Sequence, residues 1–310
     1  MAKNSSFELP NTFQWNNWAV RYAKLQHPSQ PPNTSTVVFV HGTPWSSDVF
    51  RPIADALLAT RRFDIVLYDL PGYGQSHVFN AQARGSGSDT EPDVSVRAQG
   101  ECLAALLKHL KLAPQEDGSK APHIIAHDIA GVISFRAHLL EGCRYQSLCL
   151  LDTNCVLPWG DGFYTLVRAN PGVFEQLPGG VFEGMLRAVI QSARVPGRGL
   201  NSGWEDILAE PWLPGDDKSP QINFVRQIKQ SDDQHTAELL DNNLYSNVGC
   251  DVKILWGEAD GWIPHDKMMK LSELLGQRLK EFVAIPNAGH LVMLDQPERV
   301  ALEIARWLER

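Results

Sequence analysis

The sequence predicts an α/β protein: a doubly wound, mostly parallel sheet with an inserted helical cap. Two observations carry this prediction. Short β-rich runs alternate with amphipathic helical patterns over most of the 310 residues, as expected for parallel strands joined by crossover helices. Between about residues 155 and 245 the alternation stops, and apolar residues at helical spacing, punctuated by prolines, take its place.

The strands divide the chain into a core and a cap. Thr12–Asn16 and Val20–Leu25 are expected to pair as antiparallel strands at one edge of the sheet. The expected parallel strands are Thr36–Val40, Asp64–Leu70, His123–His127, Ser147–Asp152, Val252–Gly257 and Phe282–Pro286. Residues 1–154 and 246–310 are therefore assigned to the core. Residues 155–245 are assigned to a cap over the carboxyl ends of the strands, where such sheets bind ligands.

Helices are expected between these strands. Apolar residues recur at helical spacing in three places: Val49, Ile53 and Leu57; Leu103, Leu106, Leu107 and Leu110; and Val300, Ile304 and Leu308. The segment His77–Pro92 is rich in Gly, Ser and Asp and is expected to be a surface loop.

Composition excludes several classes of protein. The net charge of -8 and the lack of a dense Lys/Arg cluster argue against nucleic-acid binding. No apolar run approaches the roughly 20 residues of a membrane helix, and Met1–Pro10 lacks the apolar stretch of a secretory signal. A cytoplasmic protein with reduced, packed thiols is expected, because the cysteines are odd in number and form no Cys-x-x-Cys pair. They are Cys102, Cys143, Cys149, Cys155 and Cys250.

The most informative motif is the sharp turn predicted at Asp128. An apolar strand precedes it and a helical stretch follows, which is the sequence pattern of a nucleophile elbow. A tight elbow needs small residues two before and two after the nucleophile, and Ala126 and Ala130 occupy those places. Asp128 is therefore the candidate nucleophile.

An aspartate at this position restricts the chemistry. Carboxylate attack on a carbonyl gives an anhydride, which is a poor intermediate. Attack on a saturated carbon with a leaving group gives an alkyl ester that water can cleave at its carbonyl. The motif therefore indicates an enzyme that opens a carbon–oxygen or carbon–halogen bond at an sp3 carbon.

Partners for Asp128 are expected at later strand ends, in the order nucleophile, acid, histidine. Asp260 follows one apolar strand and His290 follows the next. His290 is expected to take a proton from water, and Asp260 to orient the imidazole and stabilise its charged form. Asp152, also at a strand end, is the competing candidate for the acid.

Two backbone amides are expected to form an oxyanion hole. One is that of Ile129, directly after the nucleophile. The other is that of Thr43, in a His-Gly-Thr-Pro turn where Gly42 permits close approach of the backbone. His41 and His127 are expected to brace the turns rather than to react.

At these residues the chain resembles the α/β-hydrolase superfamily, specifically the aspartate-nucleophile branch of epoxide hydrolases and haloalkane dehalogenases. The segments that carry the resemblance are His41–Pro44, Asp69–Ser76, Ala126–Gly131, Trp256–Asp260 and Gly289–His290. The resemblance covers nearly the whole core. It implies an α/β-hydrolase fold and an ester mechanism without metal or organic cofactor.

The chain departs from this branch at two positions. Dehalogenases commonly place a tryptophan after the nucleophile and an asparagine after the His-Gly pair, and both help to hold the leaving halide. This chain has Ile129 and Thr43 there, which weakens the dehalogenase interpretation. Trp45, Trp159 or Trp262 could substitute.

Epoxide opening requires a proton donor, since the departing alkoxide is strongly basic. Epoxide hydrolases resemble one another in using cap tyrosines, and the candidates are Tyr164 and Tyr245. The expected partner is an apolar small-molecule substrate, and its binding site is expected to include Trp45, Trp159 and Phe163.

Three functions follow, in order of preference. The first is an epoxide hydrolase that uses water to form a diol. The second is a haloalkane or haloacid dehalogenase with the same ester intermediate. The third is a non-catalytic small-molecule-binding protein on a hydrolase scaffold. No metal-ligand cluster or phosphate-binding glycine loop is present in the sequence.

Overall fold

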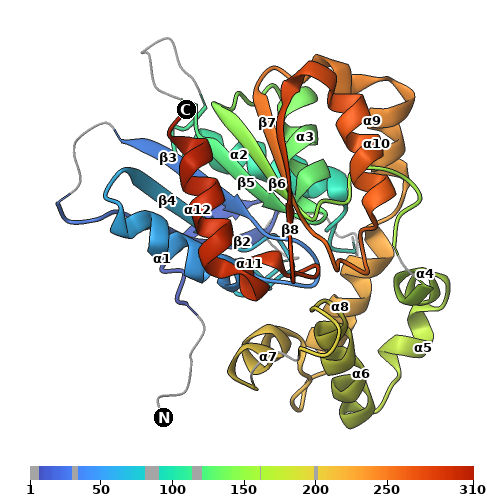
Figure 1. Cartoon of the computed structure of the whole chain (residues 1–310). Coiled ribbons are helices and arrows are strands. Elements are labelled where there is room, and N and C mark those ends of the chain that lie inside the picture. Colours follow the sequence, from blue (N-terminus) through green and yellow to red (C-terminus); the bar gives the residue numbers. More distant parts are fainter. Residues whose placement is uncertain (1–6, 30–33, 81–90, 114–120, 161, 199–201) are drawn as a thin grey trace.

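A single mixed sheet forms the centre of the protein (Figure 1). The computed structural model describes residues 7–29, 34–80, 91–113, 121–160, 162–198 and 202–310. The strands are β1 (Asn11–Trp15), β2 (Trp18–Leu25), β3 (Ser35–Val40), β4 (Phe63–Tyr68), β5 (His123–His127), β6 (Ser147–Leu151), β7 (Asp251–Gly257) and β8 (Leu279–Ile285). Their order in the sheet is β1-β2-β4-β3-β5-β6-β7-β8. β1 and β2 are antiparallel, as are β2 and β4, and the other neighbours are parallel.

The predicted strands are confirmed, with ends that shift by at most three residues. β5 and β6 are buried along their whole length, as expected for central parallel strands covered on both faces. The largest shift is at β8, which begins at Leu279 rather than Phe282. β8 lies at the sheet edge, and its polar residues Lys280 and Glu281 mask the strand in the sequence pattern.

Helices cover both faces of the sheet (Figure 1), with α1, α11 and α12 on one face and α2 and α3 on the other. The α-helices are α1 (Arg51–Ala59), α2 (Val96–His109), α3 (Ala130–Leu139), α4 (Gly162–Ala169), α5 (Pro171–Glu175), α6 (Gly179–Ser192), α7 (Ser202–Ala209), α8 (Ser219–Gln230), α9 (Gln234–Asp241), α10 (His265–Leu275), α11 (Val292–Asp295) and α12 (Pro297–Leu308). The short 3-10 helices are η1 (Ser47–Phe50), η2 (Glu210–Trp212), η3 (Leu244–Asn247) and η4 (Gly276–Arg278).

Local sequence explains how these helices start and what they bury. The Ser95 hydroxyl accepts a hydrogen bond from the Ala98 amide and caps α2. Pro297 opens α12, a position where its missing N–H costs nothing. Val300, Ile304 and Leu308 of α12 are buried, as their spacing predicts.

The helices α4 to α9 are inserted between β6 and β7. α4 to α8 extend beyond one end of the sheet, whereas α9 lies beside α10 (Figure 1). Among the described residues of this insertion there is no strand, in agreement with the lost β pattern. The five cysteines are free and buried, as predicted. Of the predicted surface loop His77–Pro92, residues 81–90 lie outside the described part of the chain.

Candidate active site

The turn between β5 and α3 forms the predicted elbow at Asp128. This residue has φ of 55°, a left-handed conformation uncommon for any residue but glycine. Its carbonyl accepts hydrogen bonds from the amides of Gly131 and Asn154, each at 3.1 Å. It accepts a third from the Thr153 hydroxyl at 2.9 Å. A Cβ at position 131 would lie 1.7 Å from Thr153 Oγ1, so only glycine allows α3 to start this close to the end of β6.

Two backbone amides hydrogen bond the Asp128 carboxyl group. The Thr43 amide donates to Oδ2 at 2.9 Å, and the Ile129 amide also hydrogen bonds this carboxyl group. The loop after β3 can approach because residue 42 is glycine; a Cβ there would lie 2.5 Å from Asp128 Cβ. These amides are the two donors that the sequence predicts for an oxyanion hole.

His41 and His127 brace this region, as predicted. His41 donates from Nδ1 to the Gly42 carbonyl at 2.8 Å and accepts the Leu70 amide at Nε2 (2.9 Å). His127 donates from Nε2 to the His290 carbonyl at 2.8 Å. Burial lowers the pKa of both imidazoles, which keeps them neutral.

His290 lies between the two predicted carboxylates. Its Nδ1 is 3.1 Å from Asp260 Oδ2, and its Nε2 is 3.9 Å from Asp128 Oδ1. Asp260 is fixed by the amides of Trp262 and Ile263, which donate to Oδ1 at 2.8 and 3.0 Å. The imidazole stacks on the Trp262 ring, with ring centres 4.7 Å apart. The three residues therefore meet in the arrangement that nucleophile, base and orienting acid require.

Asp152, the competing candidate for the acid, lies directly after β6 and contacts the end of β7. It is fully buried, and its Oδ1 accepts the Gly257 amide at 2.7 Å. Burial, and then the charge of Asp260, raise the pKa of Asp152 well above its usual range. The raised pKa of Asp152 disfavours its charged form, and Asp260 Oδ2 lies 3.1 Å from His290 Nδ1, which favours Asp260 as the partner of His290.

The Asp128 carboxyl group is less acidic than usual. Burial raises its pKa to about 6, against the opposing effects of His290 and of the Thr43 and Ile129 amides. At neutral pH it is therefore mostly ionised, as a nucleophile must be.

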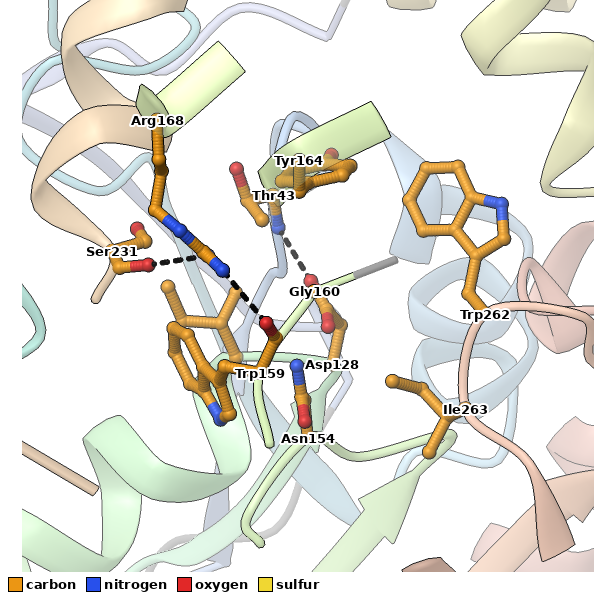
Figure 2. A pocket seen from close by; sticks show the side chains of 11 residues that line it. Thr43, Asp128, Asn154, Trp159, Gly160, Tyr164, Arg168, Ser231, Trp262 and Ile263 are labelled. Atoms are coloured by element: carbon orange, nitrogen blue, oxygen red, sulfur yellow. Dashed lines mark hydrogen bonds between the residues drawn. The ribbon is translucent and has the colours of Figure 1, made fainter. Parts of the chain in front are cut away.

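A cavity of about 30 Å³ lies over Asp128, with room for about two water molecules (Figure 2). It is lined by Thr43, Asp128, Ile129, Asn154, Trp159, Gly160, Tyr164, Arg168, Ser231, Trp262 and Ile263. Both the core and the inserted helical segment contribute to this wall. The cavity therefore brings the candidate nucleophile against residues distant in the sequence.

Of the predicted cap and pocket residues, Trp159 and Tyr164 line the cavity. Trp45 does not: it is buried behind Trp262, with the two rings stacked 5.7 Å apart. Phe163 does not line it either, because it packs on the other side of α4 against Phe174. The predicted substrate contacts of Trp45 and Phe163 are therefore corrected to packing roles.

Tyr245 is the other correction. It lies in η3, buried against Phe135, and its hydroxyl donates to the Cys155 carbonyl at 2.7 Å. It does not line the cavity over Asp128. This placement contradicts the predicted role of proton donor, and Tyr245 instead ties η3 to the segment that follows β6.

Five lining residues were not predicted from the sequence: Asn154, Gly160, Arg168, Ser231 and Ile263. For Arg168 a signal existed, because it follows Tyr164 by four residues and such pairs share a helix face. Once Tyr164 is a candidate, Arg168 should be one also. The other four lie in loops whose path no periodicity indicates.

A residue of the inserted segment also contacts Thr43, in the loop that follows β3. Gln227 of α8 accepts hydrogen bonds at Oε1 from the Thr43 hydroxyl and from the Tyr73 hydroxyl, the latter at 3.0 Å. Gln227 and Tyr73 are both buried. Position 43 is thus fixed by the core through its backbone and by α8 through its side chain.

Within the described residues, no group of three or more His, Cys, Asp or Glu side chains could hold a metal ion. The same part of the chain contains no helix long and apolar enough to cross a membrane.

Comparison with known proteins gives the class. Residues 37–303 match the model of the alpha/beta hydrolase family. An alpha/beta hydrolase fold protein from Burkholderia ambifaria is 30% identical, with a TM-score of 0.82 and coverage of 99% of both chains. The chain belongs to the alpha/beta hydrolase family and is a hydrolase of that superfamily.

More distant relatives differ in their described activities. The dihydrolipoyllysine-residue acetyltransferase component of the acetoin cleaving system of Pseudomonas putida is 26% identical over 88% of this chain. The match spans only 63% of that relative's length. The structure of a mutant of the haloalkane dehalogenase DatA from Agrobacterium tumefaciens has a TM-score of 0.72 at 16% identity. It covers 97% of this chain and 96% of its own, a likeness that shows the fold alone.

Proposed function

We propose that this chain is an epoxide hydrolase in which Asp128 forms a covalent ester with the substrate. The placement of the two Asp128 carboxylate oxygens carries this proposal. Oδ2 accepts the Thr43 amide and the carboxyl group is also hydrogen bonded by the Ile129 amide, while Oδ1 lies 3.9 Å from His290 Nε2. One oxygen is thus positioned as the future ester carbonyl and the other as the attacking atom.

The first step opens the ring. Asp128 Oδ1 forms a bond to a ring carbon while the carbon–oxygen bond of the epoxide breaks. The electron pair passes to the ring oxygen, which takes a proton. Tyr164, whose ring lines the cavity, is the donor we assign.

The second step cleaves the ester. His290 removes a proton from water, and the resulting hydroxide attacks the Asp128 carbonyl carbon. The Thr43 and Ile129 amides hold the tetrahedral oxyanion, and Asp260 stabilises the imidazolium. Collapse breaks the bond between the Asp128 acyl carbon and Oδ1, which leaves with the substrate and takes the proton from His290. The diol is released, and the restored carboxylate contains the oxygen from water.

We assign residues 155–245 to a cap that closes the cavity over this chemistry. Trp159, Tyr164, Arg168 and Ser231 of this segment line the cavity together with Asp128. Asn154, directly before the segment, lines it also. A closed site excludes bulk water, which strengthens the electrostatic interactions inside it.

The test is capture of the ester. His290→Gln is expected to gain the mass of one propylene oxide molecule on the peptide that contains Asp128, and Asp128→Asn is expected to gain none. In a single turnover of the wild-type protein in heavy-oxygen water, the diol should carry an unlabelled new oxygen. A labelled oxygen in that first turnover would show that solvent attacks the epoxide directly.

One observation supports dehalogenation as the second candidate. Trp159 lines the cavity, and its buried indole N–H has no hydrogen-bond acceptor among the described residues. Such a donor suits a leaving halide. Trp262, by contrast, donates to the Ser192 hydroxyl at 3.2 Å. Halide release from 1-chlorobutane and 2-chloropropionate, measured beside diol formation from propylene oxide, distinguishes the two functions.

A further inference from the structure

Arg168 is the basic side chain in the cavity wall, and its guanidinium is held in a fixed orientation. It lies in the last turn of α4. Nη2 donates to the Trp159 carbonyl at 2.7 Å and Nη1 to the Ser231 carbonyl at 3.2 Å (Figure 2). Both acceptors are neutral. In the described part of the chain no carboxylate forms an ion pair with Arg168.

Two other arginines of low exposure form ion pairs with carboxylates. Arg136 pairs with Glu238 at 2.6 Å, and Arg194 pairs with Asp295. A guanidinium withdrawn from water is stabilised when a carboxylate accepts its hydrogen bonds. Arg168, which lines the cavity, thus retains donor capacity, because two neutral carbonyls satisfy only part of its five N–H groups.

Gly160 makes room for this guanidinium. It has φ of +79°, and a Cβ there would lie 3.1 Å from both Nη1 and Nη2 of Arg168. The same Cβ would lie 3.0 Å from Tyr164 Cβ. The backbone at Gly160 therefore packs closely against the Arg168 guanidinium, and a larger residue at this position would displace it.

The cavity places Arg168 and the Asp128 carboxylate around one small space. An anionic substrate would be repelled by Asp128 unless a cation compensates its charge. The planar guanidinium is suited to bind a carboxylate through two parallel hydrogen bonds. A volume of about 30 Å³ further favours a short carbon chain.

We propose that Arg168 binds a carboxylate of the substrate, so that the preferred epoxide is a short 2,3-epoxycarboxylate. The identity of the reacting group rests on the proposed function, whereas the anion site rests on the contacts of Arg168. Attack by Asp128 Oδ1 opens the ring, and hydrolysis of the ester adds one water in total. The product is a 2,3-dihydroxycarboxylate. The apolar substrate predicted from the sequence is thereby replaced by one with an apolar middle and a charged end.

The first experiment compares glycidate with glycidamide, its neutral counterpart of nearly equal shape. The wild-type ratio of kcat/KM, glycidate over glycidamide, is expected to be at least about tenfold. In Arg168→Met the ratio should fall by roughly 10- to 100-fold, and Arg168→Lys should be intermediate. Using a ratio removes losses that come from poorer folding. Arg97→Met, at an exposed site on α2, is the matched control and should keep the wild-type ratio.

The second experiment measures binding of glycerate, the product of glycidate, by calorimetry. Arg168→Met should bind it at least about tenfold more weakly than the wild-type protein. Equal affinity in the two proteins, or a ratio unchanged by Arg168→Met, would overturn the anion site. If propylene oxide still alkylates His290→Gln in that case, the proposed function stands alone. If glycerate binding depends on Arg168 and no epoxide gives an ester, the anion site stands and epoxide hydrolysis is wrong.

Discussion

The two sides of the cavity differ in the contacts that position their residues. We call the side formed by Asp128, Asp260 and His290 the floor, and the side formed by Tyr164 and Arg168 of α4 the roof. On the floor, Asp128 and Asp260 accept hydrogen bonds from backbone amides at the ends of strands. On the roof, Arg168 and Tyr164 come from α4: Arg168 donates to the carbonyls of Trp159 and Ser231, and the Tyr164 ring packs against Trp262 of the core. The difference teaches that amides from the loops of the core fix the reacting groups, whereas the groups that select a substrate depend on contacts made by one helix of the inserted segment. Each can then be altered while the other is preserved.

Replacing Asp260 and Asp152 in turn tests which acid supports His290. The loss of kcat in the Asp260 variant should be the largest effect of all. Asp260→Asn is expected to lower kcat by about 10³- to 10⁴-fold, because His290 then loses its charged partner and its tautomer. Asp152→Asn should cost at most about tenfold, since burial disfavours the charged form of Asp152 and asparagine can still accept the Gly257 amide. Rapid-quench measurement of ester decay checks both. Similar losses in the two variants would show that the acids share the role.

The pH dependence also tests the floor. Burial raises the pKa of Asp128 to about 6, so the rate of ester formation should fall about tenfold per pH unit below this value and level off above it. Single-turnover rates between pH 4.5 and 8 measure this step, and a flat profile would contradict the assignment of Asp128.

The same pKa predicts an effect on stability. The pKa of Asp128 is higher in the folded state than its usual value near 3.9, so its contribution to folding becomes less favourable as pH rises from about 4 to 6. Asp128→Asn should therefore raise the free energy of unfolding by about 1 to 3 kcal/mol at pH 8 and change it little near pH 4. Urea titration at the two pH values checks the sign.

The two cap tyrosines sharpen the contrast on the roof. Tyr164→Phe should slow epoxide opening by roughly 10- to 100-fold through loss of the proton donor. Tyr245→Phe should leave this step nearly unchanged and lower the free energy of unfolding by about 1 kcal/mol, because the Cys155 carbonyl loses its hydrogen bond. If Tyr245→Phe instead slows the reaction more than Tyr164→Phe, the donor has been assigned to the wrong residue.

Gln227 of α8 connects the inserted segment to Thr43 and Tyr73 of the core. Its replacement should give the smallest change in rate. Gln227→Met removes the acceptor of the Thr43 and Tyr73 hydroxyls and should lower the rate of ester hydrolysis by about 3- to 10-fold. Ester formation should change less, since the Asp128 carboxyl group keeps its amide donors. An equal effect on both steps would indicate general loosening of the cap. Gln221→Met, in the same helix but bonded only within the cap, is the control.

The floor could be predicted because strand ends fix where its residues lie. Asp128, Asp260 and His290 each follow an apolar run at the carboxyl edge of a parallel sheet, and that edge brings them together whatever the loops between them contain. Gly42 and Thr43 were recognisable for the same reason. Local sequence therefore determined this half of the site.

The roof could not be predicted in the same way. Tyr164 and Tyr245 are both aromatic residues in a helical segment, and only tertiary packing decides that one lines the cavity and the other bonds the Cys155 carbonyl. Phe163 differs from Tyr164 by a single position and hence by a turn of about 100° on the helix. Trp45 belongs to the core but lies behind Trp262, a contact between distant segments that periodicity does not reveal.

The tight space above Asp128 has a kinetic consequence. Because this space is small, we expect admission and discharge of an epoxycarboxylate to be accompanied by an outward displacement of α4 or of the segment around Trp262. Such gating couples the turnover number to the frequency of opening, and added viscogen should slow steady-state diol production while leaving the pre-steady-state burst of ester intact.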